Sequence, residues 1–269
     1  MSVHPFDEAV ALTPLGEHRW QGRTSPAYAN MVGPFGGVTA AQALSAVLNH
    51  PALLGEPVSL TVNFAAAVAD GTFELSARPV RTNRSTQHWV VDMQQNGDTV
   101  LTATVFTAVR RDTWKAVEHA MPEVPQPSDV AAAGGPKRVE WVSRYEMRFV
   151  EGAFPSAWDA QDHGTSRSRL WLRDNPPRPL DFASVAALSD VFFPRIWRRR
   201  ASPVPIGTVS MTVYFHAGRE QLAQAGAGYL LGQAQAQAFH DGYFDQTAQL
   251  WTEAGHLLAT THQVVYYKE

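Results

Sequence analysis

Short stretches of the first half of the chain recur in the second half, in the same order. Ala43-Leu44-Ser45 returns 144 positions later as Ala187-Leu188-Ser189. Residues 58–64 (VSLTVNF) return 151 positions later as residues 209–215 (VSMTVYF), with five of the seven positions identical. Two matches in register indicate that the chain is built from two structural units of one kind.

The segment between the two copies has the composition of a linker. Residues 116–138 contain four prolines, three consecutive alanines and the pair Gly134-Gly135, and such residues are typical of connections between folded units. We therefore predict a first repeat over 1–115, a linker over 116–138 and a second repeat over 139–269.

Each repeat has the same predicted order of elements. One helix is expected in each repeat, and each is apolar on nearly all sides and hence buried; these are residues 37–49 and 182–193. Pro194 is expected to end the second helix. Strands follow, since the next runs are rich in Val, Thr and aromatic residues: 58–66, 72–82, 86–95 and 99–109, then 209–217, 227–239, 243–252 and 257–267. This order predicts an α+β fold whose two sheets pair into a pseudo-dimer.

Composition and charge exclude several classes of protein. The 22 basic and 25 acidic residues give a net charge of −3, so there is no basic excess for binding nucleic acid. The absence of cysteine excludes a disulfide framework, a thiolate metal site and a cysteine nucleophile. No run approaches the ~20 apolar residues of a membrane span, and residues 1–8 lack the pattern of a signal peptide. We expect a cytoplasmic protein.

Matching the two repeats shows three places where a polar residue of the second replaces an apolar residue of the first. Asp190 falls opposite Ala46, Thr208 opposite Pro57, and Gln263 opposite Phe106. A carboxylate on an apolar helix stripe loses hydration and needs hydrogen-bond donors, which an amide and a hydroxyl supply. Such a set suits a single active site kept in one repeat. It equally suits a hydrogen-bonded structural aspartate beside two ordinary strand residues.

At these residues the chain resembles the type II (TesB-like) acyl-CoA thioesterase family of double-hotdog proteins. In the first half the resemblance includes the turn Phe35-Gly36-Gly37 into a helix. In the second half it includes Leu188-Ser189-Asp190, Gly207-Thr208 and the strand segment ending at Gln263. The strand Val58-Ser59-Leu60-Thr61 lacks a histidine that members tend to carry, and Ala65–Ala67 replace bulkier residues, which leaves the acyl substrate open.

The resemblance implies an acyl-CoA hydrolase of fatty acid metabolism with Asp190, Thr208 and Gln263 as catalytic residues. It also implies attack by water without a covalent acyl-enzyme, and no cofactor, since CoA is part of the substrate. In this scheme Asp190 accepts a proton from a water that Gln263 and Thr208 hold in place. The helix N-terminus at Gly36-Gly37 is a candidate oxyanion site, because free N–H groups and the positive dipole end meet there. A tight turn explains the two glycines equally well.

Other patterns carry weaker functional predictions. Arg198, Arg199 and Arg200 could contact the phosphates of CoA, although an arginine run of this kind is more often a solvated loop. The histidines have no metal-ligand spacing, so no metal is expected. Asp174-Asn175-Pro176-Pro177 is followed by no nearby histidine, which argues against a hydratase on the same fold.

Two functions remain in competition at this stage. The first is hydrolysis of an acyl-CoA, or of an acyl chain on a carrier protein, to the free fatty acid. The second is non-catalytic binding of an acyl-CoA or acyl lipid, because a fold does not fix a function. In either case we expect a homodimer or a larger homo-oligomer, since the edge strands of such sheets invite pairing.

Overall fold

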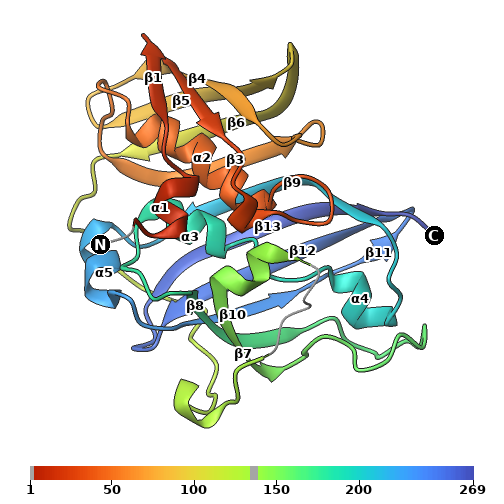
Figure 1. Ribbon diagram of the computed structural model, residues 1–269. Helices are drawn as coiled ribbons and strands as arrows, with labels where there is room; N and C mark the ends of the chain where they lie inside the picture. Colours follow the sequence, from red (N-terminus) through yellow and green to blue (C-terminus); the bar gives the residue numbers. More distant parts are fainter. Residues whose placement is uncertain (1–2, 134–138) are drawn as a thin grey trace.

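The backbone forms one antiparallel sheet that runs through both halves of the chain (Figure 1). The computed structural model describes residues 3–133 and 139–269. In the sheet the strand order is β1-β2-β4-β5-β6-β3-β9-β13-β12-β10-β8-β7, with β11 paired to β12. The order on one side of the β3–β9 junction repeats on the other, which is the pseudo-dimer that the sequence repeat predicts.

The first half consists of the strands β1 (Thr13–Gly16), β2 (Arg19–Arg23), β3 (Glu56–Phe64), β4 (Thr72–Thr82), β5 (Thr86–Gln95) and β6 (Asp98–Ala108), and the helices α1 (Pro5–Ala9), η1 (Pro26–Tyr28) and α2 (Gly36–Leu48). The strands of the second half are β7 (Tyr145–Glu151), β8 (Ser168–Asp174), β9 (Ile206–Phe215), β10 (Leu230–Gln235), β11 (Phe239–His240), β12 (Tyr243–Thr252) and β13 (Leu257–Tyr267). Its helices are α3 (Phe182–Leu188), α4 (Arg195–Arg200) and α5 (Arg219–Ala225), and η2 (Pro127–Asp129) and η3 (Glu140–Arg144) precede β7.

The two copies of the repeated segment pair with each other at the centre of the sheet. Strands β3 and β9 run antiparallel, and Thr61 lies directly opposite Thr212, its own counterpart 151 positions later. Their hydroxyl oxygens are 3.0 Å apart. A residue that faces its own repeat equivalent marks a pseudo-two-fold axis, and this axis relates the strand order of one half to that of the other.

The predicted strands agree closely with those observed. The bounds of β4, β5, β12 and β13 are the predicted ones, and β3, β6 and β9 differ by one to three residues at an end. The run 227–239 is wrong in part, because β10 ends at Gln235 and β11 begins only at Phe239. The four outer strands β1, β2, β7 and β8 were not predicted. They have four to seven residues each, and a short run gives a weak strand signal. Strand β1 is also exposed throughout.

Helices α2 and α3 pack together on the inner side of the sheet, and both are almost wholly buried. The prediction of a helix over 182–193 is wrong at its C-terminus. Helix α3 ends at Leu188, and Asp190 lies in the turn that follows it. Pro194 therefore does not end this helix but stands directly before α4. An apolar run after a helix can be a buried turn, and periodicity alone does not distinguish the two.

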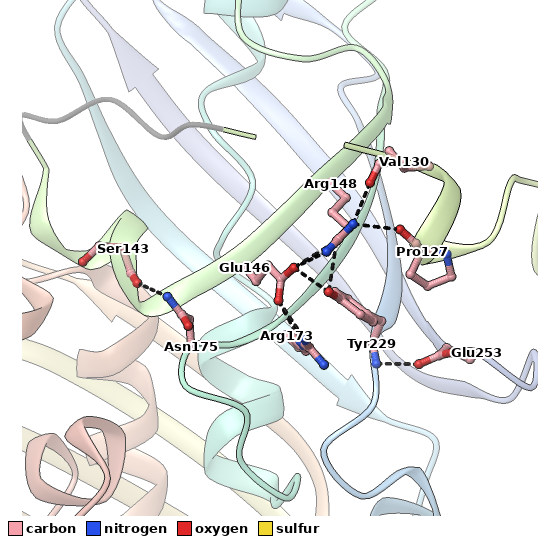
Figure 2. Close-up of polar contacts among 9 residues, drawn as sticks. All are labelled: Pro127, Val130, Ser143, Glu146, Arg148, Arg173, Asn175, Tyr229 and Glu253. Atoms are coloured by element: carbon pink, nitrogen blue, oxygen red, sulfur yellow. Dashed lines mark hydrogen bonds and ion pairs between the residues drawn. The ribbon is translucent and has the colours of Figure 1, made fainter. Parts of the chain in front are cut away.

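The connection between the halves packs against the outer face of the second half as a strap, residues 119–133. Trp171 and Trp251 donate their indole N–H groups to the backbone carbonyls of Pro125 (2.8 Å) and His119 (3.3 Å). Arg148 donates to the carbonyls of Pro127 and Val130, as Figure 2 shows. The predicted linker is thus an ordered cover over most of its length, and residues 134–138 lie outside the described residues. Both tryptophans are buried.

Candidate active site

Asp190 and Gln263 lie together where the two central helices meet the sheet. The Gln263 side-chain N–H donates to Asp190 Oδ1 over 2.8 Å. Gln263 is buried on β13, and Asp190, just after α3, is partly exposed. The backbone N–H of Gly37 in the first turn of α2 is close enough to the same carboxylate to lower its pKa. Two of the three predicted catalytic residues and the predicted glycine turn therefore converge.

Helix α2 approaches this carboxylate closely because its first two residues have no side chain. A Cβ on Gly36 would lie 2.8 Å from Asp190 Oδ2, and a Cβ on Gly37 would lie 2.5 Å from the carbonyl oxygen of Ala187. Both glycines are thus explained by close contact between α2 and the end of α3. The residue before the helix, Phe35, provides no side-chain cap, so the first N–H groups of α2 face the site.

Burial sets the protonation of Asp190. Desolvation raises the pKa of this carboxyl group to about 7, against the opposing effects of the Gln263 amide and the Gly37 N–H. The positive end of the α2 dipole also favours the ionised form. A carboxyl group with a pKa near neutrality is a good general base, because a large fraction of it is ionised at physiological pH and the carboxylate is a stronger proton acceptor than an ordinary one.

Thr208 faces the same side of the sheet because of a β-bulge. On β13, Gln263 pairs with Met211 and Val264 with Ser210, but Val265 pairs with Thr208, so that one residue of β9 is skipped. An extra residue reverses the alternation of side chains beyond it. Thr208 therefore lies on the inner face, two pairs further along the ladder than Gln263. Among the described residues no hydrogen bond joins Thr208 to Asp190 or Gln263.

The sheet register corrects one of the three pairings between the repeats. Met211 corresponds to Leu60, and Leu60 pairs with Val105. The counterpart of Gln263 is therefore Val105, and the prediction of Phe106 is wrong by one residue. Phe106 points to the other face, against His88. The position opposite Gln263 is still apolar, so the contrast between the two copies holds.

The arginines of α4 are largely engaged with protein groups. Arg199 forms an ion pair with Asp162 (2.8 Å) and donates to the Gly164 carbonyl, and Arg200 pairs with Glu269. Arg198 keeps a buried Nε with no hydrogen-bond partner among the described residues. The run forms a helix rather than the loop expected. Its contact with CoA phosphates stays a prediction.

Two copies of a helix packed on an antiparallel sheet, joined edge to edge into one sheet, define a double-hotdog protein. A search of solved structures finds a conserved protein of unknown function with a hot dog fold from Alicyclobacillus acidocaldarius, at 46% identity, a TM-score of 0.93, and coverage of 100% of this chain and 99% of that one. The tesB protein of Mycobacterium avium subsp. paratuberculosis has 18% identity and a TM-score of 0.78 over 99% and 100% of the two chains. The acyl-CoA thioesterase II TesB2 of Mycobacterium marinum has 17% identity and a TM-score of 0.77 over 98% of each of the two chains.

Family models match most of the chain. The acyl-CoA thioesterase N-terminal domain matches residues 25–108, and the acyl-CoA thioesterase C-terminal domain matches residues 118–267. The chain therefore belongs to the acyl-CoA thioesterase family, of the TesB-like type that the resemblance indicated. No match was found among curated proteins. Within the described residues no helix is long and apolar enough to cross a membrane.

Proposed function

We propose that the protein hydrolyses an acyl-CoA thioester to a free fatty acid and CoA, with Asp190 as the general base. The observation that carries this proposal is the buried Gln263 amide bonded to Asp190 over 2.8 Å beside the uncapped first turn of α2. A base and a set of free N–H donors at one point are the two requirements for attack of water on a carbonyl.

The proposed chemistry proceeds through a tetrahedral intermediate. A water held by Gln263 and Thr208 attacks the thioester carbon as its proton passes to Asp190. The carbonyl oxygen becomes an oxyanion, which the N–H groups of Gly37 and its neighbours stabilise. Collapse breaks the carbon–sulfur bond, and Asp190 returns the proton to the departing thiolate. Asp190 is regenerated, so the reaction leaves no group bound to the protein.

Thiol release from a panel of acyl-CoA esters of graded chain length tests the proposal. The wild-type protein is expected to release thiol, and Asp190→Asn is expected to lose about 10²- to 10⁴-fold in kcat, the usual contribution of a general base. Thr208→Val keeps the shape and removes the hydroxyl, and should lose less. Matched thermal melting curves show that the variants fold.

The same measurement separates catalysis from passive binding. If no ester is cleaved, and acyl-CoA binds the wild type and Asp190→Asn with equal affinity, the proposal is wrong. The protein is then an acyl-CoA binder, and Asp190 has a structural role. Cleavage of esters on a carrier protein but not on CoA would instead change the substrate and leave the catalytic roles intact.

A further inference from the structure

A second group of buried polar side chains lies between the two halves, close to Asp190. It consists of Tyr28 on η1, Tyr145 at the start of β7 and Asp174 at the end of β8, which we call the Tyr-Tyr-Asp cluster. These residues are 0%, 4% and 2% exposed. Both phenol oxygens and both Asp174 carboxylate oxygens lack a hydrogen-bond partner among the described residues. Buried polar groups are nearly always hydrogen-bonded, so four such atoms in one place call for an explanation.

The three side chains face one another. Tyr145 and Asp174 are directly opposite on the paired strands β7 and β8, so their side chains share a face. The rings of Tyr28 and Tyr145 meet edge to face, with centroids 6.3 Å apart. Burial and then the charge of Asp174 raise the pKa of the Tyr28 phenol. The three side chains thus belong to one buried region.

The neighbouring strand pair shows that the fold can satisfy a carboxylate here. Glu146 and Arg173 are the next opposed pair on β7 and β8, and they point to the outer face. Figure 2 shows Glu146 bound by Arg173, Arg148 and the hydroxyl of Tyr229. On the inner face the nearest guanidinium is Arg178, and it is bonded to Asp7 and Asp181 instead of Asp174. Asp174 is thus left with acceptor atoms that no protein donor fills.

One aromatic layer separates this cluster from the candidate active site. The ring of Tyr145 meets that of Phe35 edge to face, with centroids 6.0 Å apart. Phe35 directly precedes Gly36, beside Asp190 Oδ2. Burial is the main cause that raises the pKa of the Tyr145 phenol, followed by the charges of Asp174, Tyr28 and Asp190 in that order. The contact between the rings of Phe35 and Tyr145 therefore joins the cluster to the start of α2.

We propose that the Tyr-Tyr-Asp cluster is the subsite for a hydrogen-bond-donating group, a hydroxyl or an ammonium, carried on the acyl chain of the substrate. The inference rests on the proposed hydrolase function and names its substrate class. All four unpartnered atoms are oxygens that accept hydrogen bonds, and the two phenols can also donate. A plain hydrocarbon chain would leave them unpaired, which is how a site built for a polar group rejects its apolar analogue.

The test compares kcat/KM for acyl-CoA esters of one length, either plain, with a hydroxyl at successive carbons, or with a terminal ammonium. The wild type is expected to prefer one polar ester by about tenfold or more over the plain one. Asp174→Asn and Tyr145→Phe should each reduce that ratio by about tenfold. A loss on Asp174→Asn that is confined to the ammonium ester identifies a cation, and a loss confined to a hydroxyl ester identifies an alcohol.

Matched controls lie on the outer face of the same part of the sheet, with Glu146 on β7 and Tyr229 directly before β10. Glu146→Gln and Tyr229→Phe make the same chemical changes on the outer face and should leave the ratio unchanged. The inference is wrong if the wild type prefers the plain ester, or if the cluster variants and the controls have the same ratio. If Asp174→Asn fails to fold, Tyr145→Phe and Tyr28→Phe carry the test.

Failure of the proposed function gives a different result from failure of the subsite. If no ester at all is cleaved, the hydrolase proposal fails, and the subsite is judged by calorimetric binding of the polar and plain esters to the wild type and Tyr145→Phe. Tighter binding of a polar ester that Tyr145→Phe abolishes supports the subsite. Equal binding of both esters overturns it.

Discussion

The two central helices begin in opposite ways, although they occupy equivalent places in the two halves. Helix α3 has a full capping box: Asp181 accepts from the Ser184 N–H, and the Ser184 hydroxyl accepts from the Asp181 N–H. Helix α2 begins with Gly36 and Gly37 and has no side-chain cap. The carboxylate that faces it, Asp190, comes from the other half.

If the proposed function holds, this difference separates a structural helix end from a functional one. Asp181 caps its own helix by accepting from the Ser184 N–H, which takes up a donor of that helix end. Asp190 lies opposite an end that keeps its donors, and at the counterpart of Asp190 on α2 there is only Ala46. Pro57 and Val105 complete an apolar second copy. The duplicated fold thus contains one polar site and one apolar counterpart at which the helix end is already capped.

The sharpest test of this comparison replaces in turn the aspartate at each helix start: Asp190, which faces the start of α2, and Asp181, which caps α3. Asp190→Asn should lose activity by the factor given above and remain folded. Asp181→Ala removes a helix cap and an ion pair with Arg178. It should cost about 1–2 kcal/mol of unfolding free energy with kcat within a few-fold of the wild type. Thiol release and urea unfolding on both variants check this. Equal activity losses would show that both helix ends serve catalysis.

The pH dependence of stability gives the next largest effect. Asp190 has a pKa of about 7 in the folded state, against 3.8 ordinarily, so folding binds a proton between these values. Its contribution to stability is present below pH 4 and is lost as the pH rises through 7. Asp190→Asn should therefore be more stable than the wild type at pH 8, by on the order of a few kcal/mol of unfolding free energy. Near pH 4 the two proteins should have equal stability, which thermal melting at both pH values checks.

Glu146 is the control, because its pKa is lowered rather than raised and its effect on the pH dependence of stability has the opposite sign. Burial of Glu146 is outweighed by its hydrogen bonds from Tyr229, Arg173 and Arg148, which lower its pKa to about 2. The ionised Glu146 stabilises the fold at any pH above the ordinary pKa of 4.5, and this stabilisation is lost as the pH falls through 2. Glu146→Gln should therefore be less stable than the wild type at pH 8. Higher stability of both Asp190→Asn and Glu146→Gln at pH 8 would contradict the two directions of pKa shift.

The smallest expected effect comes from rebuilding the site in the first half. Ala46→Asp, Pro57→Thr and Val105→Gln, introduced together into Asp190→Asn, restore the side chains but face the capped end of α3. We expect no recovery of thiol release above the Asp190→Asn background. Recovery without any change at Asp181 would show that the helix end is not what distinguishes the two halves.

The internal repeat made much of this structure predictable. Alternation along β4, β5, β12 and β13 placed their bounds, and the residues that differ between copies pointed to Asp190 and Gln263. Two features were beyond this reasoning. The β-bulge that turns Thr208 inward is not marked by any particular residue type in the sequence. The pairing of Gln263 with Phe106 instead of Val105 came from misaligning the preceding turn by one residue. The contact of Tyr28 with Tyr145 joins residues distant in sequence that carry no shared motif.

The pairing of β3 with β9 has a consequence during synthesis of the chain. Thr61 leaves the ribosome 151 residues before Thr212, its partner in the sheet. Until β9 is made, the nascent first half carries β3 as an open edge, and open edges recruit other strands. A truncated first half should therefore associate with a second copy of itself through β3, which would reproduce as a dimer the junction that the full chain forms internally.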